Sequence, residues 1–139
     1  MELIEIVEQI NTILSKENWL DMEVLGMKGG SLTIIGSTDF TYSHSLEIKF
    51  EDVFYMSINM EWKADTSKPF LYLVDSSERI DINQKYRIEQ GNTLFKILSE
   101  DLETPFYISA KKISFNTDNV LYYRKDNLEN NERIADWVQ

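Results

Sequence analysis

Cysteine is absent from this sequence, histidine occurs once, proline twice and glycine five times. The lack of cysteine excludes disulfide scaffolds, thiol nucleophiles, zinc ribbons and iron–sulfur ligation, and it suits a reducing compartment. Few prolines and glycines argue against a long flexible linker. No apolar run approaches the roughly 18 residues of a membrane span, and the N-terminus is acidic where a signal peptide needs basic residues. We therefore expect a cytoplasmic protein that does not cross a membrane.

Basic residues are also scarce. The chain has 14 Lys and Arg against 24 Asp and Glu, which gives a formal net charge of −10. This charge repels phosphate backbones and anionic lipids, so it disfavours nucleic acid and membranes and favours a basic protein partner. An acidic surface that only keeps the protein soluble would have the same composition.

The sequence does contain enough apolar material for one core. Of its 139 residues 42% are hydrophobic, with 7 Phe, 7 Tyr and 3 Trp. A chain of this length fits one domain, which we expect to extend over residues 1–139. In its first part, about 2–17, apolar residues recur at spacings of three and four, which predicts an amphipathic helix. The apolar stripe consists of Leu3, Ile6, Val7, Ile10, Ile13 and Leu14.

After the first helix the apolar period changes to two, which predicts a β-rich body from about residue 20 to 124. A turn at Gly29-Gly30 predicts the pairs Lys28–Ser31, Met27–Leu32 and Leu25–Ile34. In the stretch "SHSLEIKFEDVFYMSINMEW" a three-residue loop, Glu51 to Val53, would join two half-buried strands. The expected pairs are Phe50–Phe54, Ile48–Met56, Leu46–Ile58, His44–Met60 and Tyr42–Trp62.

The second half contains further strand patterns. "KPFLYLVD" predicts a strand with Pro69 at its entrance. Residues 86–100 fit a strand or a helix, and strands are favoured. "PFYISAKKISFNTDNVLYYRKD" predicts strands with a bulge at Lys111-Lys112 and a hairpin through Thr117-Asp118 that pairs Phe115 with Val120 and Ile113 with Tyr122. Residues 127–138 predict a short helix with Asn127 as its cap, which would dock on its own domain.

Two segments, "IKFEDVFYM" and "ISFNTDNVLYY", share an order of Ile, Phe, a polar turn, Val and aromatic residues. A duplicated hairpin would explain this echo. Such a simple pattern also arises by convergence, so we interpret it as hairpin chemistry and not as a repeat architecture.

The single histidine is the first candidate for chemistry. His44 could act as a general base or a metal ligand. No second histidine, cysteine or nucleophile turn accompanies it, so we favour a partly buried, hydrogen-bonded structural histidine. The many carboxylates offer acid–base pairs, but Glu47 is expected to face solvent beside Tyr55 and Ser57, and no two carboxylates are forced into one pocket. We expect no catalytic residue, no metal and no cofactor.

The order of these patterns along the chain is similar to that of a known group of proteins. The succession of an N-terminal helix, "DMEVLGMKGGSLTIIG", "SLEIKFEDVFYMSI", "FYISAKKISF" and "NVLYYR" resembles small acidic bacterial proteins of unassigned function, some of them grouped with immunity proteins of polymorphic toxin systems. It covers about Asp21 to Arg124. The resemblance implies a cytoplasmic, non-catalytic α+β module that binds a protein such as a toxin domain, and it transfers no functional residue. Toxin nucleases are often basic, so an acidic inhibitor would gain steering from its charge.

The expected fold is α+β, with the N-terminal helix packed on a twisted, mainly antiparallel sheet built from hairpins and with a short C-terminal helix. The leading function is a non-catalytic protein-binding module, in particular an immunity-type inhibitor of a basic toxin domain. Its expected interface mixes acidic and aromatic rim residues. These residues are Glu51, Asp52, Tyr55, Glu61, Trp62 and Asp65.

Two other functions remain open. A small-molecule-binding domain would use an aromatic sheet face near His44, Tyr42, Tyr72 and Tyr107, and it requires a concave apolar pocket there. A hydrolase would use carboxylates and His44, and it requires these groups to converge within hydrogen-bond reach in one cleft.

Overall fold

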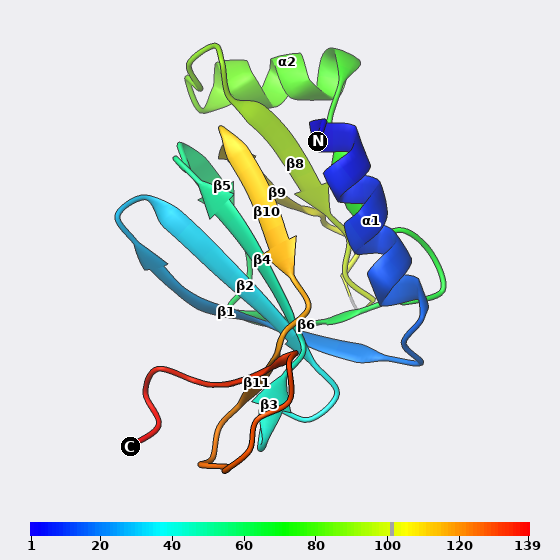
Figure 1. Ribbon diagram of the computed structural model, residues 1–139. Helices are drawn as coiled ribbons and strands as arrows, with labels where there is room; N and C mark the ends of the chain where they lie inside the picture. The colour runs from blue at the N-terminus through cyan, green and yellow to red at the C-terminus, as the bar shows by residue number, and fades with distance from the viewer. Residues whose placement is uncertain (101) are drawn as a thin grey trace.

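The computed structural model of the protein describes residues 1–100 and 102–139 (Figure 1). The helices are α1 (Leu3–Ser15) and α2 (Ser76–Lys85). The strands are β1 (Leu20–Lys28), β2 (Ser31–Ser37), β3 (Ser43–His44), β4 (Leu46–Glu51), β5 (Tyr55–Ser57), β6 (Glu61–Ala64), β7 (Leu71–Leu73), β8 (Thr93–Ile97), β9 (Phe106–Ala110), β10 (Lys112–Asn116), β11 (Asn119–Leu121) and β12 (Glu132–Ile134). Among the described residues, every strand pair is antiparallel except β11 with β12, which is parallel. The two helices and these strands confirm the predicted α+β class with a mainly antiparallel sheet.

The largest sheet has five strands in the order β10-β4-β2-β1-β6. Its central hairpin turns at Gly29 and Gly30, both with positive φ, and Lys28 pairs with Ser31 as expected. The predicted Leu25–Ile34 pair is wrong, because a bulge between Val24 and Gly26 leaves Leu25 out of the ladder and pairs Val24 with Ile34. A bulge of this kind inserts one residue and shifts the side chains that follow it to the other face.

A four-stranded sheet, β5-β9-β8-β7, lies beside the first. The predicted hairpin between residues 46–50 and 54–60 is wrong, because β4 pairs with β2 and β10 while β5 pairs with β9. The chain changes sheets at Asp52, which has a φ of 54°, and it returns at Lys111, where a bulge was predicted. The two echoing segments therefore form no hairpins. Their Ile-Phe strands pair with each other instead, Phe50 with Ile113 and Ile48 with Phe115.

The main core is enclosed by α1 and the two larger sheets. Val7, Ile10 and Leu14 of α1 are buried, which confirms the predicted amphipathic helix. Asn11, on the same helix, closes the edge of β7: its Oδ1 accepts from the backbone N–H groups of Phe70 and Leu71, and its Nδ2 donates to the Leu71 carbonyl. In Figure 1, α1 lies alongside β8 and β10. Helix α1 thus buries its apolar side chains in the core, and its Asn11 supplies hydrogen-bond partners to the edge of β7.

The C-terminal part forms a small sheet, β12-β11-β3. The predicted helix over 127–138 is wrong, since residues 132–134 form β12 parallel to β11. The predicted hairpin between 113–115 and 120–122 is also wrong, because β11 pairs with β3 and not with β10. An isolated helix of about ten residues has only marginal stability in water. Pairing with β11 instead satisfies the backbone hydrogen bonds of residues 132–134.

Helix α2 was not predicted. Asp75 caps its N-terminus by accepting from the Ser76 backbone N–H at 2.6 Å, and Glu78 follows three residues after the cap, a typical helix-start signal. The helix buries none of its side chains, so apolar periodicity does not mark it. Glu78 ties α2 to the outer face of the four-stranded sheet by accepting from Tyr107 Oη and Lys96 Nζ. Residues 93–97 form β8, the strand alternative favoured for that region.

Candidate functional site

One row of side chains crosses the outer face of the five-stranded sheet, opposite the core. In register from edge to edge the row consists of Glu61, Glu23, Ile35, Glu47 and Asn116. Residues in one row of a sheet project to the same side. Three carboxylates thus share one face, and their surroundings separate them into two groups.

Glu47 belongs to a hydrogen-bonded cluster with His44 at its centre. The His44 Nε2 lies 2.7 Å from Glu47 Oε2, and its Nδ1 lies 2.7 Å from Tyr122 Oη. The other carboxylate oxygen of Glu47 accepts from Arg133 Nη2 and Asn116 Nδ2. This polar cluster, His44, Glu47, Asn116, Tyr122 and Arg133, joins the sheet to the C-terminal segment.

The cluster has one consistent arrangement of protons. Hydrogen bonds from Asn116 and His44, together with the Arg133 charge, lower the pKa of Glu47, although burial opposes them and is the largest single influence. Glu47 is therefore ionised and accepts from the His44 Nε2–H. The Nδ1 atom of the neutral imidazole then accepts from the Tyr122 hydroxyl. Burial lowers the pKa of His44, and burial with two carboxylates raises the pKa of Tyr122 to about 12.

This geometry corrects the expectation for Glu47 and sharpens that for His44. Glu47 does not face solvent beside Tyr55; its side chain is only 15% exposed and holds the histidine. The histidine is hydrogen-bonded as expected but fully buried, with 0% exposure, and pairs with Val120 rather than Met60. His44 and a carboxylate do converge, as a hydrolase would require. A substrate cannot reach the imidazole, however, while the C-terminal segment covers it.

Glu23 and Glu61 form the second group. They pair directly across β1 and β6, and Asp21 lies two residues before Glu23. Burial and then the charges of Glu61 and Asp21 raise the pKa of Glu23. Within the described residues, no lysine, arginine or histidine forms an ion pair with Asp21, Glu23 or Glu61. Like charges directly opposite in a sheet are destabilising, so this fold retains an electrostatic cost here.

A depression of about 450 Å³ lies over this second group. Its lining consists of Asp21, Met22, Glu23, Phe40, Glu61, Trp62 and Lys63. We call these residues the acidic groove. Tyr122 is close enough to Glu23 for that carboxylate to raise the tyrosine pKa, so the polar cluster and the acidic groove are neighbours on one sheet face.

The structure does not bring the expected interface residues together. Glu51 follows Phe50, which lies in register with Met27 of β1, whereas Glu61 pairs with Glu23. Glu47 lies in the same row as Glu61, so four residues along β4, from Glu47 to Glu51, and three strand spacings separate the two regions, about 13 Å by about 14 Å. Glu51 also has a cationic neighbour, Lys49 at 3.4 Å.

The remaining members of that set are equally scattered. Trp62 is 8% exposed and packs edge-on against Phe106 in the core, so it is not a rim residue. Tyr55 stacks on Tyr86 beyond α2, and Asp65 accepts from Ser67 in the loop after β6. Asp52 is at the sheet change. Only Glu61 and the buried Trp62 line the acidic groove.

The expected ligand face is divided between two places. Tyr72 and Tyr107 lie on the outer face of the four-stranded sheet with Lys96 between them in register. His44 and Tyr42 lie with the small sheet, where Tyr42 is 60% exposed and its carbonyl accepts from the Tyr122 backbone N–H. These four residues do not line one common pocket.

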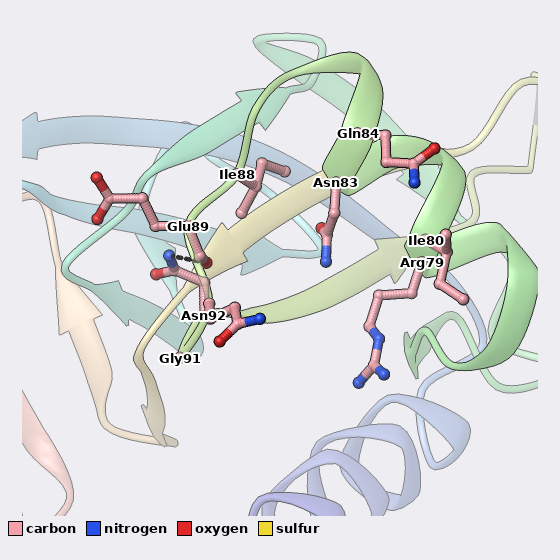
Figure 2. Close-up of a pocket in the computed structure, with 9 residues that line it drawn as sticks. Arg79, Ile80, Asn83, Gln84, Ile88, Glu89, Gly91 and Asn92 are labelled. Carbon is pink, nitrogen blue, oxygen red and sulfur yellow. Dashed lines mark hydrogen bonds between the residues drawn. The ribbon is translucent and has the colours of Figure 1, made fainter.

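A depression of about 470 Å³ does lie between α2 and the loop that follows it. Figure 2 shows its polar lining, with Arg79 and Asn83 extending from α2 and Asn92 on the loop opposite. The side-chain oxygens of Asn83 and Asn92 are shielded from solvent and have no hydrogen-bond partner in the described chain. The lining contains none of the four residues expected to form a ligand face.

Comparison with known proteins adds no relative: no family model, curated protein or solved structure matches the chain. No group of three or more potential metal ligands is assembled in residues 1–100 and 102–139. Within the same residues, neither helix has the length and apolar character needed to cross a bilayer.

Sequence reasoning missed Asp21, Glu23, Tyr122 and Arg133. The alternation of acidic and apolar residues in "LDMEV" does predict that Asp21 and Glu23 share a face. It does not predict that β6 places Glu61 beside them. Tyr122 and Arg133 meet His44 and Glu47 from 78 and 86 residues away along the chain, and no local pattern encodes such contacts.

Proposed function

We propose that this protein is a non-catalytic binding module that engages a basic partner protein through the acidic groove. The observation that carries the proposal is the unneutralised pair Glu23 and Glu61, which face each other with Asp21 nearby. A lysine or arginine of a partner placed between them would relieve their repulsion. It would also gain charge-assisted hydrogen bonds in a partly desolvated site.

The surroundings of the groove suit a protein contact. Phe40 contributes a half-buried aromatic surface to the lining, and Lys63, which lies in register with Asp21, is the single cation among the lining residues. Interfaces combine aromatic anchors with charged groups in this way, and the arginine side chain is enriched in them. The net charge of −10 would add long-range steering toward a basic partner.

The finer form of the proposal is an immunity-type inhibitor that neutralises a basic toxin domain in the cytoplasm. Strand patterns similar to those of immunity-type proteins, the absence of cysteine and the acidic composition support this form. The buried imidazole favours inhibition by binding over catalysis, because the one histidine stabilises the fold and does not face a cleft.

The test is affinity capture from a lysate of the native cells with the tagged full chain, washed at low and at raised salt. Retained proteins are identified by mass spectrometry. The expected result is one dominant basic protein whose retention falls as salt rises.

Two variants make this test specific. Glu23→Gln combined with Glu61→Gln removes the groove charges, and capture is expected to fall at least about tenfold. Glu2→Gln combined with Glu17→Gln removes the same charge from exposed positions outside the groove and is expected to leave capture unchanged. Equal losses in both double variants would show that net charge, and not the groove, retains the partner. Capture of no basic protein in either wash would refute the proposal.

A further inference from the structure

The second half of β1 has a free edge. Strand β6 pairs with residues 20–23 of β1, and this ladder ends where the Val24 backbone N–H donates to the Met60 carbonyl. No described strand pairs with residues 25–28 on that side, and all four of these residues are exposed. A Cβ added at Gly26 would meet nothing within 4 Å. In Figure 1 the β1–β2 turn projects away from β6, so this edge is open to solvent.

Hydrogen-bond alternation identifies the free backbone groups of this edge. The two-residue turn at Gly29-Gly30 makes Lys28–Ser31 a hydrogen-bonded pair. The backbone groups of neighbouring residues in a strand point to opposite sides, so the N–H and C=O groups of Met27 point away from β2. They have no backbone partner among the described residues. Met27 is itself 48% exposed, so another chain can reach both groups.

One face of the edge is apolar. Met27 lies in register with the buried Leu32, so its side chain is on the core side of the sheet. Met60, which is 67% exposed, adjoins the same edge through its hydrogen bond with Val24. Methionine side chains are flexible and adapt to apolar groups of different shape. An apolar side chain of an added strand would therefore contact Met27 and Met60.

The other face of the edge leads to the acidic groove. Gly26 pairs with Thr33 and Glu23 pairs with Ile35, so the two rows are two residues apart along β2, about 7 Å. Gly26 has no side chain to block this path. An added strand would continue the line of β6, which begins at Glu61. A lysine or arginine placed opposite Gly26 would consequently reach the carboxylates of Glu23 and Glu61.

We propose that an extended segment of the basic partner adds to the free edge of β1, antiparallel to it and in line with β6. This inference rests on the proposed function, because it extends the contact made at the acidic groove. The segment would exchange two backbone hydrogen bonds with Met27, and its basic side chain would enter the acidic groove. Lys28, at the far end, would favour a neutral or acidic residue opposite it. The net charge of −10 disfavours a second copy of this chain as the occupant.

The test uses a synthetic probe with these properties, the capped hexapeptide Thr-Val-Thr-Val-Arg-Val, titrated into the isotope-labelled full chain. Binding is followed through the backbone amide signals and their hydrogen exchange. The Met27 amide is expected to shift and to exchange at least about threefold more slowly with saturating peptide, because it gains a strand partner. The Lys28 amide, already paired with Ser31, is expected to change less and is the reference within the same strand.

Two matched peptides separate the backbone contribution from the charge. The same hexapeptide with N-methylated valines keeps its charge but cannot donate to the Met27 carbonyl, and it is expected to bind at least about fivefold more weakly. The peptide with glutamate in place of arginine is expected not to bind, because the acidic groove repels it.

A proline variant tests the same hydrogen bonds from the side of the protein. Proline is tolerated on an edge strand where its missing N–H would face solvent, so Met27→Pro is expected to keep its fold and its amide signals elsewhere. Its peptide binding is expected to fall at least about fivefold. Met27→Leu keeps the N–H group and is expected to bind within about twofold of the natural protein.

Four results would overturn the inference. They are an unchanged Met27 amide at millimolar peptide, equal binding of the N-methylated peptide, equal binding of the acidic peptide, and protection of Met27 that rises with protein concentration alone. The last result would assign the edge to a second copy of this chain. Failure here is distinguishable from failure of the proposed function, because capture of a basic protein that depends on Glu23 and Glu61 can persist when Met27 takes no part.

Discussion

Acidification from pH 7.0 to 5.5 is expected to destabilise the protein through one residue, His44. Its imidazole is fully buried, and burial lowers its pKa from the ordinary 6.5. In the unfolded chain the histidine binds a proton near pH 6.5, whereas the folded state resists protonation until a lower pH. The unfolded state therefore binds more protons in this interval, and the free energy of unfolding falls as pH falls.

The size of the effect has an upper limit. One group changes the free energy of unfolding by at most about 1.4 kcal/mol per pH unit. With an unfolded pKa of 6.5 and a folded state that stays neutral, the loss between pH 7.0 and 5.5 is about 1.3 kcal/mol. The chain has no other histidine. The lowered pKa of Glu47 reduces the free energy of unfolding mainly below about pH 4.5, outside this interval. The raised pKa of Glu23 has the opposite sign, because there the folded state binds a proton more readily than the unfolded state, so it opposes the loss.

Urea unfolding followed by tryptophan fluorescence at the two pH values measures this difference. The natural protein is expected to lose stability on acidification, by no more than about 1.3 kcal/mol. The variant His44→Gln keeps a polar side chain that does not titrate, so it is expected to be less stable at pH 7.0 but to lose little on acidification. An equal loss in the variant and the natural protein would refute the assignment to His44.

Other expectations can be checked on single variants. Tyr122→Phe is expected to lower the free energy of unfolding in urea by about 1–3 kcal/mol, because the buried imidazole loses a donor, whereas Tyr42→Phe at an exposed position changes it by less than about 0.5 kcal/mol. Asn11→Ala is expected to cost about 1–3 kcal/mol in the same assay, since the edge of β7 loses its side-chain partner; an unchanged midpoint would show that water replaces it. Glu61→Gln is expected to stabilise the protein by about 0.2–1 kcal/mol in thermal unfolding, because it removes the like charge opposite Glu23, and destabilisation would contradict the repulsion. Amide exchange is expected to be faster in α2 than in β2, because α2 buries no side chain; equal protection would contradict its loose packing.

Local signals predicted several elements well. The apolar stripe of α1, the two-glycine turn and the alternation in residues 20–37 and 46–50 all appear in the structure. Each depends on a period or a turn that a few neighbouring residues set. Helix α2 lacks an apolar face, so its only local signals were the cap at Asp75 and the acidic Glu78 three residues later. The C-terminal segment was predicted as a helix because weak apolar spacing and a candidate cap at Asn127 were its local signals.

Strand pairing was the main error. Phe50 can face Phe54 or Ile113 with the same alternation, and both choices bury the same apolar face. The chain between β4 and β5 turns into the other sheet, which no turn signal in "FEDVF" specifies. The partner of each strand depends on which pairing buries the apolar face in the complete core, so the alternation of residues alone does not determine it.

By itself, the sequence determined the acidic charge, the positions of α1 and many of the strands, and which side chains share a face, because composition and period are local properties. Only the tertiary structure decided that Glu47 binds His44 and Arg133 and that Glu23 faces Glu61. These contacts join segments far apart along the chain, and their energies depend on burial and on charges that other strands supply.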